Sequence, residues 1–264
     1  IFLNPQASGS VASNIQVKSC HIQSFRETGV YMTNCRGAAI NNNHISRPLL
    51  QNVSNSSGIA AINANRECLI EGNRIYDCFK SVISSSQFVD FYALNIQNAT
   101  DTRIGNNIVY ENSNQGRWYG IYLRCSPGVN ILYNTLSNDN TSTTSGNIVG
   151  FYHENACASS GAIFKNNIVT IARAGTATRY AIYQDGQAID IDNNNLFVSS
   201  GSNSYIGYAG SQNYQSLIGW QSASGAGSPF DKNSVSYNPK YANLASGNLT
   251  PENIMVDGVG TTCV

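Results

Sequence analysis

A short motif recurs along the whole chain and limits the folds that it can adopt. An aliphatic residue is followed three positions later by Asn and, two positions after that, by another aliphatic residue. Self-similarity at a period of a few tens of residues indicates a solenoid, in which each coil buries its apolar face against its neighbours. The copies are Ile40-Asn43-Ile45, Ile70-Asn73-Ile75, Ile104-Asn107-Val109, Ile131-Asn134-Leu136, Ile163-Asn166-Ile168 and Ile191-Asn194-Leu196, with Val17-Cys20-Ile22 as a variant that has Cys in the Asn position.

The copies are unevenly spaced, which favours a β-helix over a repeat of helical hairpins. Coils of a β-helix vary in length while one short strand keeps its place. The flanking aliphatic residues of the motif can point into a shared core. The Asn between them tolerates a left-handed φ and can bond neighbouring main chain, so we expect it to turn the corner between two strands. Coils stacked about 4.8 Å apart would then align the Asn side chains in a hydrogen-bonded column.

A second register precedes most of the Asn corners and indicates a further strand in each coil. A small residue is followed by an apolar residue and then commonly by Tyr. Period-2 alternation directs the apolar residue inward and the Tyr outward. The segment Phe91-Tyr92-Ala93-Leu94 fits this register less well. The chain is therefore predicted to be all-β, with inward residues at Val30, Ile59, Ile121, Phe151 and Ile182.

The composition excludes several classes of function. Charged residues make up only 11% of the chain, and 15 basic residues balance 15 acidic ones. Such a chain has no long-range field to collect nucleic acid or an anionic membrane surface, so we expect neither partner. No apolar run reaches the roughly 18–20 residues of a membrane helix, and we expect no membrane insertion. Abundant Asn, Ser, Gly and Tyr suit hydrogen bonding to neutral polar partners, among them carbohydrate.

The seven Cys are an odd number, which leaves at least one thiol without an internal partner. They form no C-x-x-C pair, which argues against a zinc knuckle or a thioredoxin-like site. Cys125 and Cys157 each precede an Asn corner by nine residues and are expected to stack on adjacent coils. Parallel side-chain directions are poor for a disulfide, so we favour free thiols that fill small core positions.

The repeat fades near residue 201 and a different segment follows. Tyr205-Ile206-Gly207-Tyr208 is expected to form a last strand, and residues 214–221 have the apolar spacing of a short helix. We interpret Trp220 as a core plug over the end of the β-helix in preference to a sugar platform. The domain prediction is coils over residues 1–200, with a last coil and a C-terminal capping segment over residues 201–264.

The order of motifs in that last segment carries a resemblance. It reads Leu-x-x-Trp-Gln, a Gly-rich stretch, Asn-Ser-Val-Ser-x-Asn-Pro-Lys-Tyr, Gly-Asn-Leu-Thr-Pro and Asp-Gly. It resembles the C-terminal segment of secreted bacterial right-handed parallel β-helix proteins of the pectate-lyase-like superfamily, especially the β-helix regions of large surface proteins and adhesins. The resemblance implies a right-handed, single-stranded parallel β-helix of about seven to eight coils. It implies no particular activity, because this architecture serves lyases, hydrolases, epimerases and inert stalks.

The resemblance also implies a place outside the cell or on its outer surface. The chain opens inside the repeat and stops before a closing strand, so we expect a fragment of a larger protein. Its expected partners are further domains of the same polypeptide or neighbouring surface proteins.

One outward face collects the best candidate site. Arg124, Glu154 and Asp185 have the same offset from the Tyr of their own coil, so consecutive coils should stack them in a column. Opposite charges stacked on parallel strands also stabilise a sheet surface, and this structural role competes with sugar binding and with catalysis. His153 is expected to point inward. The carbohydrate-binding candidates are Tyr31, Tyr122, Tyr152 and Tyr183, and the catalytic candidates are Arg124, Glu154, Asp185 and His153.

No cofactor is expected, with calcium as the lesser alternative. Asp190 and Asp192 lie on one face of a strand, beside Asn193 and Asn194, and supply oxygen ligands of the kind that Ca²⁺ takes. A solvated strand face explains the same pair of carboxylates. We therefore keep these two Asp residues as metal candidates without assigning a metal.

The sequence favours a structural or adhesive module that contacts a polysaccharide or cell-surface glycan along its Tyr face. The alternative is a polysaccharide lyase or glycoside hydrolase that uses the same face. A lyase needs a base and cations, and a hydrolase needs a pair of carboxylates. A catalytic β-helix should also have a cleft walled by long loops. The longest insertions, residues 46–57, 110–118 and 137–147, carry few charges, which favours binding over catalysis.

Overall fold

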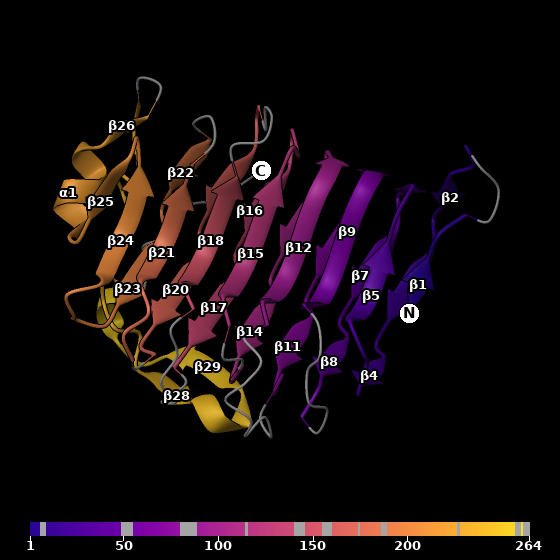
Figure 1. Ribbon diagram of the computed structural model, residues 1–264, viewed down its shortest axis with the longest axis horizontal. Coiled ribbons are helices and arrows are strands. Elements are labelled where there is room, and N and C mark those ends of the chain that lie inside the picture. The colour runs from indigo at the N-terminus through magenta and orange to yellow at the C-terminus, as the bar shows by residue number, and fades with distance from the viewer. Residues whose placement is uncertain are drawn as a thin grey trace.

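Parallel strands stack into an elongated solenoid in the computed structural model (Figure 1). It describes residues 1–5, 9–48, 55–79, 89–113, 116–139, 146–154, 160–173, 175–185, 189–225, 228–256 and 260. Three parallel sheets, called A, B and C here, run along the solenoid axis, and sheets B and C contain seven strands each. The chain is therefore the all-β parallel β-helix that the repeat predicts.

The strands follow one another around each coil in the order A, B, C. Sheet A contains β1 (Phe2–Leu3), β2 (Ala12–Ser13), β5 (Thr28–Met32), β6 (Cys35–Arg36), β9 (Ser56–Arg66), β12 (Phe91–Thr100), β15 (Trp118–Arg124), β18 (Ile148–Glu154), β21 (Arg179–Gln184), β24 (Ser204–Ala209) and the antiparallel β25 (Gln212–Tyr214). Sheet B contains β3 (Gln16–Lys18), β7 (Ala39–Asn41), β10 (Leu69–Glu71), β13 (Arg103–Gly105), β16 (Asn130–Leu132), β19 (Ile163–Lys165) and β22 (Asp190–Asp192). Sheet C contains β4 (His21–Gln23), β8 (His44–Ser46), β11 (Arg74–Tyr76), β14 (Ile108–Tyr110), β17 (Thr135–Asn138), β20 (Ile168–Ile171) and β23 (Asn195–Val198).

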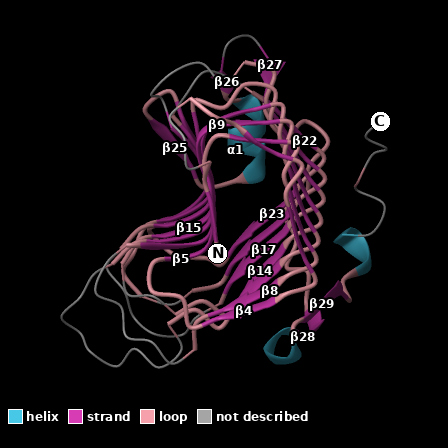
Figure 2. Ribbon diagram, turned by 90° about the vertical axis from the view of Figure 1, so that its right-hand side faces the viewer, coloured by secondary structure: helices cyan, strands magenta, loops and turns pink. Residues whose placement is uncertain are grey.

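The core is built from columns of apolar side chains that repeat from coil to coil. The predicted inward residues of sheet A are confirmed, because all five have no exposed surface. They form one continuous register, and Leu94 stands in it between Ile59 and Ile121. The segment that fitted the pattern less well is thus a regular coil with Ala93 in the small position. Figure 2 looks along the stack and shows the three sheets around this core.

The Asn column lies inside the corner between sheets B and C, as a ladder of fully buried side chains. Asn73 shows the arrangement: its Nδ2 donates to the Ile40 carbonyl at 2.7 Å and to Asn107 Oδ1 at 3.0 Å. Its Oδ1 accepts from the main-chain and side-chain nitrogens of Asn43. The predicted hydrogen-bonded column is confirmed, and its members are Asn43, Asn73, Asn107, Asn134, Asn167 and Asn194.

Two details of the predicted corner are wrong. In the fifth copy the register is Phe164-Asn167-Val169 instead of Ile163-Asn166-Ile168, since Phe164 pairs with Ile131 and Asn167 occupies the ladder. The left-handed φ also falls one position before each ladder residue, as in Asn166 with φ 58°. The corner therefore needs two adjacent residues, of which the first turns the chain and the second bonds the coils.

The end of the β-helix is closed by a short helix and by the residues that follow it, up to Ser234. Trp220 has no exposed surface, stacks on Phe230 with ring centroids 4.6 Å apart, and donates from Nε1 to Asp231 Oδ2 at 2.6 Å. The predictions of a last strand, a short helix and a Trp plug are confirmed. The elements after β25 are α1 (Leu217–Ser222), β26 (Ser224–Gly225), β27 (Ser228–Pro229), β28 (Tyr241–Asn243), η1 (Leu244–Ser246), β29 (Asn248–Pro251) and η2 (Ile254–Val256).

Asp231 and Ser234 terminate the Asn ladder by standing where the next Asn would be. Asn194 donates from its backbone nitrogen to Ser234 Oγ at 2.7 Å and from Nδ2 to Asp231 Oδ1 at 2.9 Å. Asp231 is fully buried, and this burial raises its pKa from 3.8 to about 6 against the opposing effect of its hydrogen-bond donors.

The structure corrects the interpretation of one Cys. Cys125 is disulfide-bonded, so the preference for free thiols is wrong at this position. Cys157 and Cys263 lie outside the described residues. The remaining four, Cys20, Cys35, Cys68 and Cys78, are free thiols. Within the described ranges, the model contains no helix that is both long and apolar enough to cross a membrane.

Asn107→Ala is expected to destabilise the fold by roughly 2–4 kcal/mol, because it strands buried donors of Asn73. The matched control is Asn106→Gly, one residue earlier, where the side chain is exposed and φ is 53°. Glycine adopts that φ freely, so the control should change stability by no more than about 0.5 kcal/mol. Urea denaturation of the two variants measures both values. Equal losses in both would contradict the ladder's role.

The stability that depends on Asp231 is expected to fall as the pH rises. Its folded-state pKa is raised, so its contribution is fully present below the unfolded pKa near 3.8 and is lost as the pH passes about 6. The displacement corresponds to about 3 kcal/mol. The unfolding free energy of the wild type minus that of Asp231→Asn, measured at pH 4 and pH 7, should decrease by this order. An increase would show that ionised Asp231 stabilises the cap.

Candidate functional site

A bend in the long strands of sheet A determines which side chains share its outer face. Tyr119 and Tyr122 are three residues apart, and strict alternation would put them on opposite faces. Their rings are nonetheless in edge-to-face contact, with centroids 5.7 Å apart. The alternation breaks at Gly120, between them, where the pairing register is also interrupted. Figure 2 shows that the long strands of sheet A are bent, with the concave side outward.

In all but the last of these coils the bend is occupied by a small residue, because the neighbouring coil leaves little room; Ile206 stands there in the last coil. A Cβ on Gly120 would lie 2.6 Å from the carbonyl oxygen of Gly150. A Cβ on Gly150 would lie 2.7 Å from the Ala181 carbonyl and 2.2 Å from Val169 Cγ1. The same position is small in six coils, as Gly29, Gly58, Ala93, Gly120, Gly150 and Ala181.

Two columns of tyrosines face each other across this bend and form what we call the tyrosine face. Rings within a column stack nearly parallel, as Tyr152 does on Tyr183 with centroids 4.9 Å apart. Rings of different columns meet edge to face, as Tyr119 and Tyr152 do at 5.4 Å. Such pairs are the preferred geometries of aromatic rings. The tyrosine face consists of Tyr92, Tyr119, Tyr180 and Tyr205 in one column and Tyr122, Tyr152, Tyr183 and Tyr208 in the other.

Stacking turns the ring planes toward one another, so that neighbouring rings cover much of each ring surface. Tyr119 and Tyr122 are only 6% and 9% exposed, and Tyr152 is half-buried. Burial raises the pKa of Tyr92 and of Tyr152 to about 12. These phenols therefore stay protonated at neutral pH and can both donate and accept hydrogen bonds.

The predicted charged column stands along one side of the tyrosine face. Arg124 and Glu154 are paired in register, and Arg124 Nε lies 3.1 Å from Glu154 Oε2. The Tyr122 hydroxyl donates to the same carboxylate. Asp185 follows one coil later, is exposed, and donates from its backbone nitrogen to the His153 carbonyl. Glu154 is thus bound by a cation and a phenol, an arrangement that suits a structural anchor as well as a ligand contact.

A second ion pair stands at the other side of the face. Arg117 donates from Nε to Asp90 Oδ1 at 3.1 Å, and its Nη2 lies 2.6 Å from Asp90 Oδ2. The Asp90 side chain is only 10% exposed, whereas that of Arg117 is 55% exposed. Arg117 is thereby oriented toward Tyr119, which it contacts through a side-chain hydrogen bond. The face is flanked on both sides by Arg–carboxylate pairs.

Other predicted site residues lie elsewhere. Tyr31 is in register with Tyr122 but separated from it by Ala60 and Asn95, and it stacks on Phe2 instead. His153 is fully buried and lies in hydrogen-bonding contact with Gln184, and burial lowers its pKa. Its predicted inward direction is confirmed, and it reaches no surface.

The two metal candidates have partners within the protein. Asp190 pairs with Lys165 at 2.6 Å. Asp192 accepts hydrogen bonds from the backbone and side-chain nitrogens of Asn233 and so fastens the cap. Among the described residues, no three His, Cys, Asp or Glu side chains gather closely enough to hold a metal ion.

Sequence reasoning missed five of the eight tyrosines of the tyrosine face, namely Tyr92, Tyr119, Tyr180, Tyr205 and Tyr208. Tyr119 and Tyr180 each precede a predicted outward tyrosine by three residues, a spacing that strict alternation assigns to opposite faces. The signal was present as Tyr-x-x-Tyr with a small residue in the middle, in Tyr119–Tyr122, Tyr180–Tyr183 and Tyr205–Tyr208. A small residue in a strand marks a bend or a close backbone approach.

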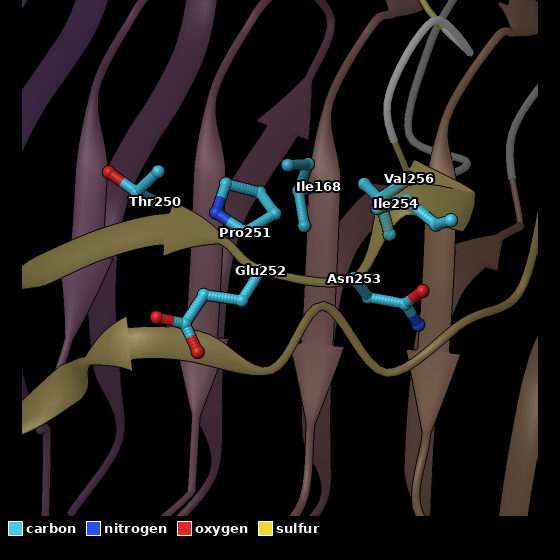
Figure 3. A pocket seen from close by; sticks show the side chains of 7 residues that line it. All are labelled: Ile168, Thr250, Pro251, Glu252, Asn253, Ile254 and Val256. Carbon is cyan, nitrogen blue, oxygen red and sulfur yellow. The ribbon is translucent and has the colours of Figure 1, made fainter.

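A separate cavity of about 380 Å³ opens between sheet C and the C-terminal hairpin (Figure 3). Ile168 of β20 forms one wall, and residues 250–254 with Val256 form the other. Figure 3 shows Glu252 directed away from the apolar side chains. The lining contains one carboxylate and no cation, so it offers no acid–base pair.

The long insertions that could wall a catalytic cleft are described only in part. Parts of the insertions at residues 46–57, 110–118 and 137–147 lie outside the described residues.

Comparison with known protein families assigns this chain to one of them. A family model described as "Right handed beta helix region" matches residues 6–196. No curated protein matches the chain. A structure of QnrB1, a plasmid-mediated fluoroquinolone resistance protein, aligns at 12% identity over 78% of this chain and 90% of that chain, with a TM-score of 0.15.

Gly150→Ala is expected to lower the free energy of unfolding by at least about 2 kcal/mol, because the added Cβ overpacks the bend. Ala181→Gly at the same position of the next coil is the control and should cost no more than about 1 kcal/mol. Urea denaturation compares the two. Similar small losses in both variants would show that the coil of Gly150 has room for a Cβ at the bend.

Proposed function

Because the chain belongs to the right-handed β-helix family, we propose that it is a rigid extracellular module whose tyrosine face binds an extended carbohydrate without cleaving it. The observation that carries this proposal is the double column of tyrosines, repeated at the coil spacing and flanked by Arg117–Asp90 and Arg124–Glu154. A polymer lying parallel to the solenoid axis would meet at least one tyrosine in each of five consecutive coils, with Val149 interrupting the first column between Tyr119 and Tyr180.

The chemistry of the face suits a polyhydroxylated partner. Phenol hydroxyls that remain protonated can donate to and accept from sugar hydroxyls, and the half-buried rings lose little entropy on binding. The exposed guanidinium groups of Arg117 and Arg124 stand on either side of the face and carry positive charge. Most ring planes are covered by neighbouring rings, so hydrogen bonding to ring edges is proposed as the main contact, with stacking confined to the ends of the columns.

Cleavage is the second candidate, and Glu154 is the group that would support it. This carboxylate could serve as the base, and the Arg124 guanidinium beside it as the cation, that a lyase requires. Its two contacts also account for it as an anchor between coils. The tyrosines are poor bases, since burial raises the pKa of Tyr122 and Tyr183 well above the ordinary phenol value. Binding is therefore preferred to catalysis.

Tyr152→Phe and Tyr183→Phe are expected to weaken carbohydrate binding about tenfold each, because they remove hydroxyls while keeping the stacked rings. Tyr133→Phe is the matched control, since Tyr133 is an exposed corner residue outside the tyrosine face, and it should leave affinity unchanged. A glycan array identifies a ligand, and calorimetry measures the variants. The proposal fails if no glycan binds or if the control loses as much affinity as the two variants.

The cleavage test incubates the same glycans with the protein. Ultraviolet absorbance detects the unsaturated products of a lyase, and a reducing-end assay detects hydrolysis. Neither signal is expected. Product formation that Arg124→Ala abolishes would overturn the non-cleaving proposal and establish a lyase.

A further inference from the structure

The C-terminal segment, residues 237–256, runs back along the outer face of sheet C, and we call it the strap. Near its start, Asn195 and Tyr237 exchange two hydrogen bonds of 2.9 Å. Further along, the Tyr241 hydroxyl lies 3.0 Å from Thr170 Oγ1. Arg74 Nη2 donates to the Gly247 carbonyl, in a coil far from the one that precedes the strap. Figure 2 shows β28 and β29 beside sheet C.

A polar cavity of about 360 Å³ lies where the strap reaches β8, β11 and β14. We call it the strap pocket. Its walls come from three consecutive coils and from the 3₁₀ helix η1, so no single segment of sequence contains it. The lining residues are His44, Arg74, Tyr76, Asp77, Tyr110, Glu111, Ala245 and Ser246.

The aromatic side of the pocket is rigid. Tyr76 and Tyr110 stack with centroids 5.2 Å apart, and the Arg74 guanidinium lies over the Tyr110 ring at 5.6 Å. His44 contacts the edge of Tyr76 at 6.1 Å and stacks on His21 at 4.7 Å. These contacts hold the donors and acceptors of the pocket in place without a ligand, which reduces the entropy lost on binding.

The acidic side of the pocket is a pair of equivalent carboxylates. Asp77 and Glu111 each follow the outward Tyr of their strand, and both have a left-handed φ, of 51° and 48°. They therefore occupy the same corner of adjacent coils, about 4.8 Å apart along the axis. Carboxylates accept hydrogen bonds from hydroxyl groups in pairs, as vicinal hydroxyls of a sugar present them.

We propose that the strap pocket binds a neutral mono- or disaccharide, with Asp77 and Glu111 accepting from its hydroxyls, Arg74 and His44 contacting it from the opposite side, and Tyr76 lining its apolar face. A volume of about 360 Å³ lies at the small end of the range for ligand pockets, which excludes a long polymer inside it. The two carboxylates repel anions. The described residues hold no three-ligand metal cluster, so a small polyhydroxylated molecule is the class that fits these walls.

This site is independent of the tyrosine face, since it lies on sheet C and uses none of the same residues. Gly247 adjoins it in sequence after Ser246, with a φ of 73°, and a Cβ there would lie 2.4 Å from both Arg74 Nη2 and the Tyr110 hydroxyl oxygen. Gly247→Ala should therefore displace the strap and open the pocket without changing any of its lining side chains.

The test is calorimetric titration of the whole protein with a panel of neutral mono- and disaccharides. Asp77→Asn and Glu111→Gln are each expected to weaken binding about tenfold or more, and Gly247→Ala is expected to abolish it. Glu67→Gln, a change in an exposed carboxylate outside the pocket, and Tyr152→Phe, a change in the tyrosine face, should leave the affinity unchanged. Circular dichroism checks that each variant is folded.

Two results would overturn the proposal. The first is that no sugar of the panel binds at millimolar concentration. The second is binding that Asp77→Asn and Glu111→Gln leave intact or that Tyr152→Phe removes, because the ligand would then occupy another surface. Failure of the tyrosine-face variants to affect polysaccharide binding would not change either result, so the two sites are tested separately.

Discussion

The structure depends on the hydrogen bonds by which one buried asparagine holds the next. Each ladder Asn uses both amide hydrogens and its oxygen on groups of neighbouring coils, so none of its polar atoms is buried without a partner. A one-residue slip between coils would break these bonds and turn inward residues outward. The ladder therefore fixes the register of every strand, and the alignment of side chains on the outer faces follows from it.

That register explains what could be predicted. The aliphatic-Asn-aliphatic motif is local and repeated, so the all-β solenoid, the inward column and the stacking of Arg124 under Glu154 could be read from sequence alone. The error at Asn166 arose because two Asn are adjacent there and the flanking residues are apolar in either register. Only the pairing of Phe164 with Ile131 distinguishes the two. The local sequence pattern predicts the repeat, and the pairing between coils decides which residue of each coil occupies the ladder.

The candidate sites were harder to predict because they depend on departures from regularity. Half of the tyrosine face comes from residues that alternation places on the wrong side, and the bend at Gly120 reverses that assignment. The strap pocket joins Arg74 to Gly247 across most of the chain, and no periodicity connects them. The Cys125 disulfide was missed for a related reason, since coil stacking was treated as if all side chains pointed in parallel. The repeated motif predicts the features that all coils share, and the features of single coils become visible only in the structure.

The cap has a consequence for assembly. A stack of identical coils presents, at its last turn, the same row of unpaired groups that each coil offers to the next, and such a surface can recruit another molecule end to end. Here Asp231 and Ser234 occupy the position of a further ladder residue while their own chain turns away through Trp220 and Phe230. At the Asn corner the cap thus takes the place of one more coil, while β25 forms the edge of sheet A at this end. The same interaction that propagates the Asn ladder also ends it, so a further copy could not extend the ladder by stacking on Asn194.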